Sequence, residues 1–165
     1  MDRSKSNDSS KSSQDKKAFS AALRVLSRRD RSETELRQKL EQFGFSHSAM
    51  VTAVEKCREY GYLNDNRYAA ERARSFMRTG RGVGLKIMLD LRRRGIDENI
   101  VQQAMESAET EFSTDQILRD QLLRRFSNFD YLTADNREKR RVVGFFQRRG
   151  FSLGQIFTIL KEEPK

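Results

Sequence analysis

Apolar residues recur at helical spacing from Ala18 onwards, and the same spacing repeats around three glycines. Gly44, Gly95 and Gly150 lie 51 and 55 residues apart, with apolar residues eight and four positions before each glycine and one, six and ten positions after it. Positions four apart share one face of an α-helix. The pattern therefore predicts that one helix ends at each glycine and that a second helix follows. The apolar residues are Leu36, Leu40, Phe45, Met50 and Val54, then Ile87, Leu91, Ile96, Val101 and Met105, then Val142, Phe146, Phe151, Ile156 and Leu160.

The residues around these glycines favour a helix end and a new helix start. Glycine adopts the left-handed backbone conformation that closes a helix C-terminus. Two residues after each glycine, a serine or aspartate is suited to cap the next helix; these are Ser46, Asp97 and Ser152. Gly61 marks another helix end of this kind, and Asn64 or Asp65 is suited to cap the helix that follows it. We therefore predict structural joints at Gly44, Gly61, Gly95 and Gly150.

A further helix precedes each glycine-linked pair. In the first repeat it carries Ala22, Val25 and Leu26, and Ala73, Phe76 and Met77 stand at the same distances before the second glycine. In the third repeat, a helix around Leu118 and Leu122 is followed by a few extra residues. We predict an all-α fold of three tandem three-helix repeats, residues 18–63, 64–112 and 113–165. Repeats that pack on their neighbours predict an elongated, curved array.

Residues 1–17 are rich in serine and charge and have almost no apolar side chains. Such a segment cannot bury enough surface to offset the entropy lost on ordering. We predict a disordered polar tail here. With no long apolar stretch and no secretion-signal pattern, we expect a cytoplasmic protein without membrane contact.

Little in the sequence supports catalysis or metal binding. The chain has one cysteine, Cys57, and one histidine, His47, which are too few for a structural zinc site. No serine or cysteine has an evident catalytic partner. We expect no enzyme activity, no catalytic or metal-binding residues and no cofactor, and a monomer in solution.

Charge is more informative. The 165-residue chain has 33 Lys and Arg against 24 Asp and Glu, a net charge of +9, so it should be attracted to polyanions or acidic protein surfaces. Positive charge is concentrated in residues 67–96 and 137–149, whereas residues 97–136 are acidic. Arginine dominates both blocks, and its planar guanidinium suits phosphates and carboxylates. The predicted contact residues are Arg72, Arg74, Arg78, Arg81, Lys86, Arg92, Arg93, Arg94, Arg140, Arg141, Arg148 and Arg149.

Each of these arginines, taken alone, is also compatible with an ordinary solvated helix face. The glycine-rich stretch from Gly80 to Lys86 resembles a phosphate loop only weakly, since no strand precedes it and no Gly-Lys-Ser/Thr is present. We interpret it as a flexible connector. With Arg78, Arg81 and Lys86 beside it, we expect a partner to contact this connector.

Two segments carry a recognisable pattern: Leu26-Ser27-Arg28-Arg29-Asp30-Arg31-Ser32-Glu33-Thr34-Glu35-Leu36 and Glu59-Tyr60-Gly61-Tyr62-Leu63-Asn64-Asp65-Asn66-Arg67-Tyr68-Ala69. Both closely resemble the RecX family of bacterial recombinase regulators. The joint Arg92-Arg93-Arg94-Gly95-Ile96 is similar too, and the resemblance extends over residues 18–160. It is strongest in the first two repeats.

The resemblance implies a partner and an activity. A protein of this family would bind the RecA recombinase, lodge along the groove of the RecA filament on DNA, and restrain strand exchange and the coupled ATP hydrolysis, with weak DNA binding of its own. Two alternatives stay open. One is a stand-alone helical DNA-binding module, since two helices that meet at a glycine turn can imitate a helix-turn-helix. The other is a helical scaffold for unrelated acidic partners.

Overall fold

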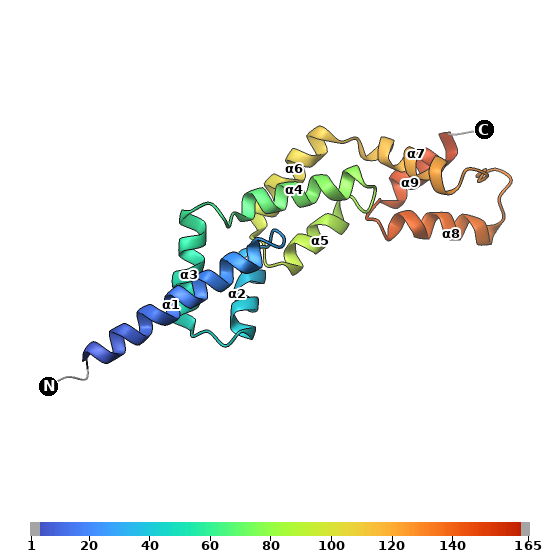
Figure 1. Ribbon diagram of the computed structural model, residues 1–165. Helices are drawn as coiled ribbons and strands as arrows, with labels where there is room; N and C mark the ends of the chain where they lie inside the picture. The colour runs from blue at the N-terminus through green and yellow to red at the C-terminus, as the bar shows by residue number, and fades with distance from the viewer. Residues whose placement is uncertain (1–3, 163–165) are drawn as a thin grey trace. The chain divides into compact units, whose positions relative to one another are not determined.

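The computed structural model describes the backbone of residues 4–162 and the side chains of residues 12–162 (Figure 1). Over this range the chain forms nine α-helices and no strand. The helices are α1 Ser4–Leu26, α2 Glu33–Gln42, α3 His47–Glu59, α4 Asp65–Arg78, α5 Leu85–Arg93, α6 Glu98–Glu111, α7 Thr114–Arg125, α8 Asn136–Gln147 and α9 Leu153–Glu162. The all-α prediction is confirmed.

The helices group into two compact units. The first unit runs to Tyr68 and also includes Arg94–Asp97, and the second comprises Ala69–Arg93 and the chain from Glu98 onwards. The connections α3–α4 and α6–α7 contain the predicted repeat limits at residues 63/64 and 112/113. That these limits are domain boundaries stays a prediction. The elongated, curved array stays a prediction too.

Helix α1 begins well before the predicted start of ordered structure. It extends back to Ser4, so over residues 4–17 the structure has a helix where the sequence predicts a disordered tail, and residues 1–3 lie outside the described residues. The apolar end of α1 is anchored by Ala18, Ala21 and Ala22, which are buried. Once a helix is nucleated, each added residue gains a backbone hydrogen bond, so the helix continues through the polar segment.

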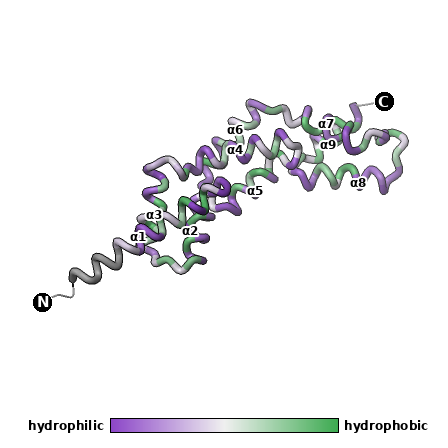
Figure 2. The backbone as a smooth tube through the Cα atoms, viewed as in Figure 1, coloured by the Kyte–Doolittle hydropathy of each residue, from purple (hydrophilic) through white to green (hydrophobic). Residues whose placement is uncertain are grey.

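The core of the first unit lies between α1, α2 and α3. One face of α1, with Ala18, Ala22 and Val25, packs on the two later helices, and Leu36 and Leu40 of α2 are buried in the same cluster. In Figure 2 the helices alternate between hydrophilic and hydrophobic stretches, as this one-sided burial requires. Burial of these small and branched side chains is what holds the three helices together.

The core of the second unit combines aliphatic and aromatic side chains. Ile87 and Leu91 of α5 are buried, as are Ile156 and Leu160 of α9. Phe146 of α8 is also buried, and it stacks edge-on against two further rings, Phe145 at 5.2 Å and Phe151 at 5.6 Å between centroids. Edge-to-face aromatic pairs stabilise a core beyond their buried area.

The helix ends coincide with the glycine joints. Gly44, Gly61, Gly95 and Gly150 have φ values of 80°, 72°, 71° and 94°, the left-handed conformation that glycine tolerates. The hydroxyls of Ser46 and Ser152 accept hydrogen bonds from the backbone N–H groups of Ala49 and Gln155. At the start of α4, the side chain of Asn64 accepts the backbone N–H of Arg67 at 2.9 Å.

Candidate functional site

The α8–α9 joint in the second unit packs against the connector between α4 and α5. The backbone N–H of Val83 donates a hydrogen bond to the carbonyl oxygen of Arg149 at 2.8 Å. A Cβ atom on Gly150 would lie 2.2 Å from the carbonyl oxygen of Val83 and 2.9 Å from the backbone nitrogen of Lys86. The structure therefore fixes the connector, which the sequence predicts to be flexible, against the joint of the third repeat.

The same contact occurs in the first unit, in the same register. The hydroxyl of Ser32 donates to the carbonyl oxygen of Arg94 at 2.6 Å, and a Cβ on Gly95 would lie 2.2 Å from Oγ1 of Thr34. Ser32 precedes Val83 by the 51 residues that separate the first two repeats. The joints at Gly95 and Gly150 thus each dock at the first interhelical connection of the preceding repeat.

Arg94, a predicted contact residue, belongs to a polar network in the first unit. Its Nη1 donates to Oε1 of Glu35 at 2.6 Å. The Glu35 carboxylate also accepts the backbone N–H of Ser32 at 3.2 Å and the hydroxyl of Tyr68 at 3.3 Å. Ser32 and Glu35 form a capping box at the start of α2. A serine followed three residues later by glutamate is a recognisable sign of a helix N-terminus, which the sequence analysis missed.

Three more predicted contact residues form ion pairs with carboxylates inside the second unit. Arg72 makes a bidentate pair with Asp90. Arg74 contacts Glu71 at 2.9 Å and Glu111 at 2.8 Å.

The third of these pairs joins α5 to the start of α6. Arg92 contacts Glu98 at 2.6 Å, and hydrogen bonds from Arg92 and Gln102 lower the pKa of Glu98 to about 2. Arg72, Arg74, Arg92 and Arg94 each pair with a carboxylate on another helix, so each of them links two helices or joints of its unit.

Arg149 is held by an aromatic ring rather than a carboxylate. Its guanidinium lies 3.5 Å from the centroid of Phe145, and its Nη1 donates to the carbonyl oxygen of Phe145 at 3.3 Å. Burial, and then the nearby charges of Arg125 and Arg148, lower the pKa of Arg149. Its Nε is buried and has no hydrogen-bond partner among the described residues. Its position is set by the core of α8.

The seven remaining predicted residues are exposed and form no ion pair within the described part of the chain: Arg78, Arg81, Lys86, Arg93, Arg140, Arg141 and Arg148. We call these seven the exposed cations. Arg78 and Arg81 lie at the C-terminal end of α4 and just beyond it, Lys86 and Arg93 lie on α5, and the other three lie on or directly after α8. The Cβ of Lys86 lies against the α8–α9 joint at Gly150, and the backbone N–H of Val83 donates to the carbonyl oxygen of Arg149, so backbone segments of the two basic blocks meet there.

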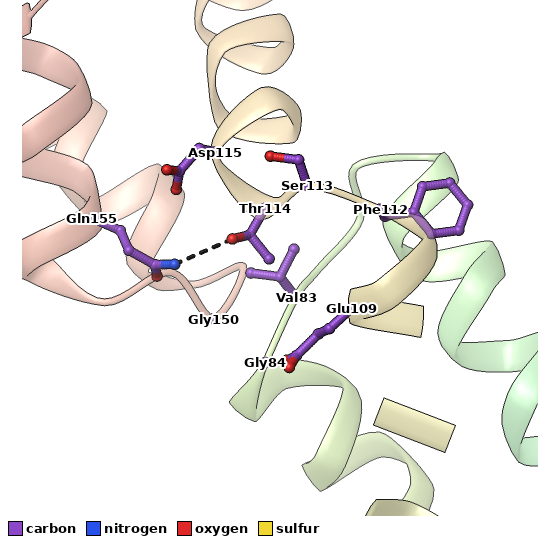
Figure 3. Close-up of a pocket in the computed structure, with 9 residues that line it drawn as sticks. All are labelled: Val83, Gly84, Glu109, Phe112, Ser113, Thr114, Asp115, Gly150 and Gln155. Carbon is purple, nitrogen blue, oxygen red and sulfur yellow. Dashed lines mark hydrogen bonds between the residues drawn. The ribbon is translucent and has the colours of Figure 1, made fainter. Parts of the chain in front are cut away.

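A pocket of about 420 Å³ adjoins the same joint (Figure 3). Its lining residues are Val83, Gly84, Glu109, Phe112, Ser113, Thr114, Asp115, Gly150 and Gln155. The side-chain amide of Gln155 donates to the hydroxyl of Thr114 at 3.3 Å, which ties α9 to the start of α7. The pocket supplies two carboxylates. Among the described residues there is no group of three or more His, Cys, Asp or Glu side chains placed to hold a metal.

The sequence of the chain matches known protein-family models over all three predicted repeats. Three family models match the chain in order: the first three-helix domain of RecX over residues 18–57, the second over 64–105 and the third over 113–160.

The chain belongs to the RecX family. Its relatives include the regulatory protein RecX of Syntrophotalea carbinolica, 45% identical over 146 residues that cover 88% of this chain and 95% of the relative. The regulatory protein RecX of Trichlorobacter lovleyi is 36% identical over 140 residues, 85% of this chain and 91% of the relative. The family resemblance predicted from the sequence is confirmed, and RecX membership indicates a regulatory role.

Solved RecX structures have the same fold. The crystal structure of RecX from Lactobacillus salivarius matches with a TM-score of 0.71 and 26% identity, over 92% of this chain and 97% of that one. A second RecX crystal structure matches with a TM-score of 0.79 and 24% identity, over 99% of this chain and 79% of that one, and supports the fold alone. None of the described helices is both long and apolar enough to span a membrane.

Proposed function

We propose that this protein regulates the RecA recombinase. It binds RecA and RecA–DNA filaments and inhibits strand exchange and ATP hydrolysis, through protein contacts and electrostatic contacts with backbone phosphates. It acts as a monomer and as a regulator rather than an enzyme, and its binding to DNA alone is weak.

The proposal rests on the exposed cations. Family membership supplies the regulatory role, and the seven side chains supply a surface that a polyanionic filament can contact. They come from helices far apart in sequence, and Lys86 meets the α8–α9 joint at Gly150. Guanidinium groups free of internal carboxylates keep their donors available for phosphates or acidic side chains.

The internally paired arginines have a different part in the proposal. Arg72 and Arg74 link helices of the second unit, as does Arg92, so replacing them perturbs the scaffold before it perturbs binding. Substitutions that test binding are therefore best restricted to the exposed cations. Of the twelve contact residues predicted from the sequence, we therefore propose that the seven exposed cations contact the filament directly.

The test is the DNA-dependent ATPase of RecA, titrated with the protein up to a near-stoichiometric amount. We expect turnover to fall with the wild-type protein and inhibition to be weaker with the triple variant R78A/R81A/K86A. The matched control R67A/R124A/K161A also removes three exposed positive charges and should inhibit like wild type. Unchanged turnover with folded wild-type protein would refute the regulatory proposal, and equal loss in both triple variants would refute the assignment of the contact residues.

Binding controls separate the proposal from its alternative. A stand-alone DNA-binding module would bind bare duplex with a sequence preference, whereas the proposal requires stronger binding to assembled RecA filaments than to bare DNA. Both types of binding weaken as salt rises, because both depend on exposed charge. Comparison at one fixed salt concentration therefore decides between them.

A further inference from the structure

The first unit contains a second basic surface, separate from the exposed cations. A groove of about 390 Å³ lies between the C-terminal half of α1 and the end of α2, two helices that pack against each other (Figure 1). Its lining residues are Ala21, Arg24, Val25, Arg28, Arg31, Lys39, Phe43 and Phe45. We call this the α1–α2 groove. None of these residues is among the twelve predicted contact residues.

The groove has an apolar interior. Ala21 and Val25 are buried in the helix interface, while Phe43 is 51% exposed at the rim and Phe45 is half-buried. Such walls favour an aliphatic or aromatic side chain, since burial of its apolar surface releases water from both partners.

The charged residues that line the groove are all basic. Arg24 lies on the same face of α1 as Ala21 and Val25, because these three residues follow the spacing of helix neighbours, and Arg28 follows in the turn just after α1. Lys39 closes the other side from α2. No acidic residue lines the groove.

An adjoining hollow extends this positive surface along α1. It is lined by Lys16, Lys17, Ser20, Arg24 and Phe45, and it shares the last two residues with the groove. The hollow, too, has no acidic lining residue. The two hollows together place six cations around one apolar groove.

These cations have few partners of their own. Lys16, Lys17, Arg24 and Arg28 form no ion pair within the part of the chain that the structure describes. The Nε of Arg31 is buried and, among the described residues, has no hydrogen-bond acceptor. A buried donor without an acceptor costs stability, so a carboxylate that entered the groove beside Arg31 would gain from pairing with it.

We propose that the α1–α2 groove binds an acidic peptide segment that inserts one large apolar side chain between α1 and α2. The large apolar side chain of the peptide packs against the apolar walls of the groove, and the six cations pair with carboxylates on either side of it in the peptide. A single-stranded nucleic acid fits less well, because its bases need free aromatic faces. Here Nζ of Lys39 covers one face of Phe43, 5.2 Å from the ring centroid, and the buried walls include the aliphatic side chains of Ala21 and Val25.

The test uses the full chain without any recombinase, so its outcome is independent of the proposed function. Fluorescence anisotropy measures the binding of a labelled peptide EDELFEDE, of a charge-only peptide EDEGGEDE and of an oligothymidylate. We expect EDELFEDE to bind more tightly than both other probes, and to bind more weakly at high salt. No binding of EDELFEDE, equal binding of EDEGGEDE, or tighter binding of the oligothymidylate would overturn the proposal.

Variants locate the site. R24A/R28A should weaken the binding of EDELFEDE about tenfold, as expected when two charge-assisted contacts are lost. F43S should weaken the binding of EDELFEDE but leave that of EDEGGEDE unchanged, and the exposure of Phe43 allows this variant to fold, which circular dichroism checks. The control R67A/R124A also removes two exposed arginines and should bind like wild type. If R24A/R28A and R67A/R124A weaken binding equally, the peptide is held by overall charge and the proposed groove is wrong.

Discussion

Substitution of Gly150 by alanine tests the docking of the α8–α9 joint on the α4–α5 connector. Gly150 has a φ of 94°, and an added Cβ would lie 2.2 Å from the carbonyl oxygen of Val83 and 2.9 Å from the backbone nitrogen of Lys86. Both contacts are with backbone atoms, so the methyl group can be accommodated only if the α4–α5 connector moves away from the α8–α9 joint.

The cost has two parts. A non-glycine residue in the left-handed conformation costs about 1–2 kcal/mol, and overpacking adds about 1–3 kcal/mol. Gly150→Ala should therefore destabilise the second unit by about 2–5 kcal/mol, a large part of the about 5–15 kcal/mol typical of a folded domain.

Gly44→Ala is the matched control. Gly44 also lies at a glycine joint, with a φ of 80°, but a Cβ there meets no atom within 4 Å. It should cost only the conformational part, about 1–2 kcal/mol. The difference between the two variants measures the docking of the joint on the connector.

Urea denaturation followed by circular dichroism gives the two free energies, fitted as separate transitions where the units unfold separately. Native-state hydrogen exchange adds a local measurement, because the N–H of Val83 bonds to the carbonyl of Arg149 and should exchange faster in Gly150→Ala. If Gly150→Ala and Gly44→Ala cost the same and the exchange of Val83 is unchanged, the docking described here is incorrect.

Three further predictions concern single groups. Ser32→Ala removes both a helix cap and a buried hydrogen bond and should cost about 2 kcal/mol by urea denaturation, against about 1 kcal/mol for Ser46→Ala, which removes a cap and an exposed contact with Ser48; equal costs would contradict the second role of Ser32. Because hydrogen bonding to Arg92 lowers the pKa of Glu98 from 4.5 to about 2, the stabilisation from this pair is present above pH 4.5 and is lost as the pH falls through about 2. The NMR titration of Glu98 should move back towards 4.5 in Arg92→Ala, and an unchanged midpoint would exclude the pair as the cause. Burial raises the pKa of Cys57 to about 11, so a thiol reagent at pH 8 should modify it slowly in the native protein and rapidly in urea, whereas fast native modification would show that the core of the first unit opens readily.

The local parts of the fold were predictable from sequence. Glycine, a following apolar residue and a serine cap specify a helix end over a few neighbouring positions, and Gly44, Ser46, Gly150 and Ser152 occupy such ends in the structure. The threefold repetition of this signal defined the three-helix repeats. The helix over residues 4–17 was not predicted, because composition measures what a segment can bury and not whether it continues a helix anchored beyond it.

The partners of the arginines were not predictable from sequence. Arg72 pairs with Asp90, 18 residues away, and Arg74 pairs with Glu111, 37 residues away. Such pairs depend on how the helices pack, and a sequence shows only that both charges are present.

The α1–α2 groove was missed for a related reason. Arg24 shares a helix face with Ala21 and Val25, a spacing that the sequence displays. The approach of Phe43 from the next helix appears only in the folded unit.

We propose that the exposed cations hold this protein on RecA filaments, and co-sedimentation measures that binding. RecA filaments assembled on single-stranded DNA are sedimented with wild-type protein, with the triple variant R140A/R141A/R148A and with the control R67A/R124A/K161A, at one fixed salt concentration. We expect the wild-type and control proteins to sediment with the filament, while most of R140A/R141A/R148A stays in the supernatant. Equal recovery of all three proteins in the pellet, or wild-type protein that sediments with bare DNA as well as it does with the filament, would contradict it.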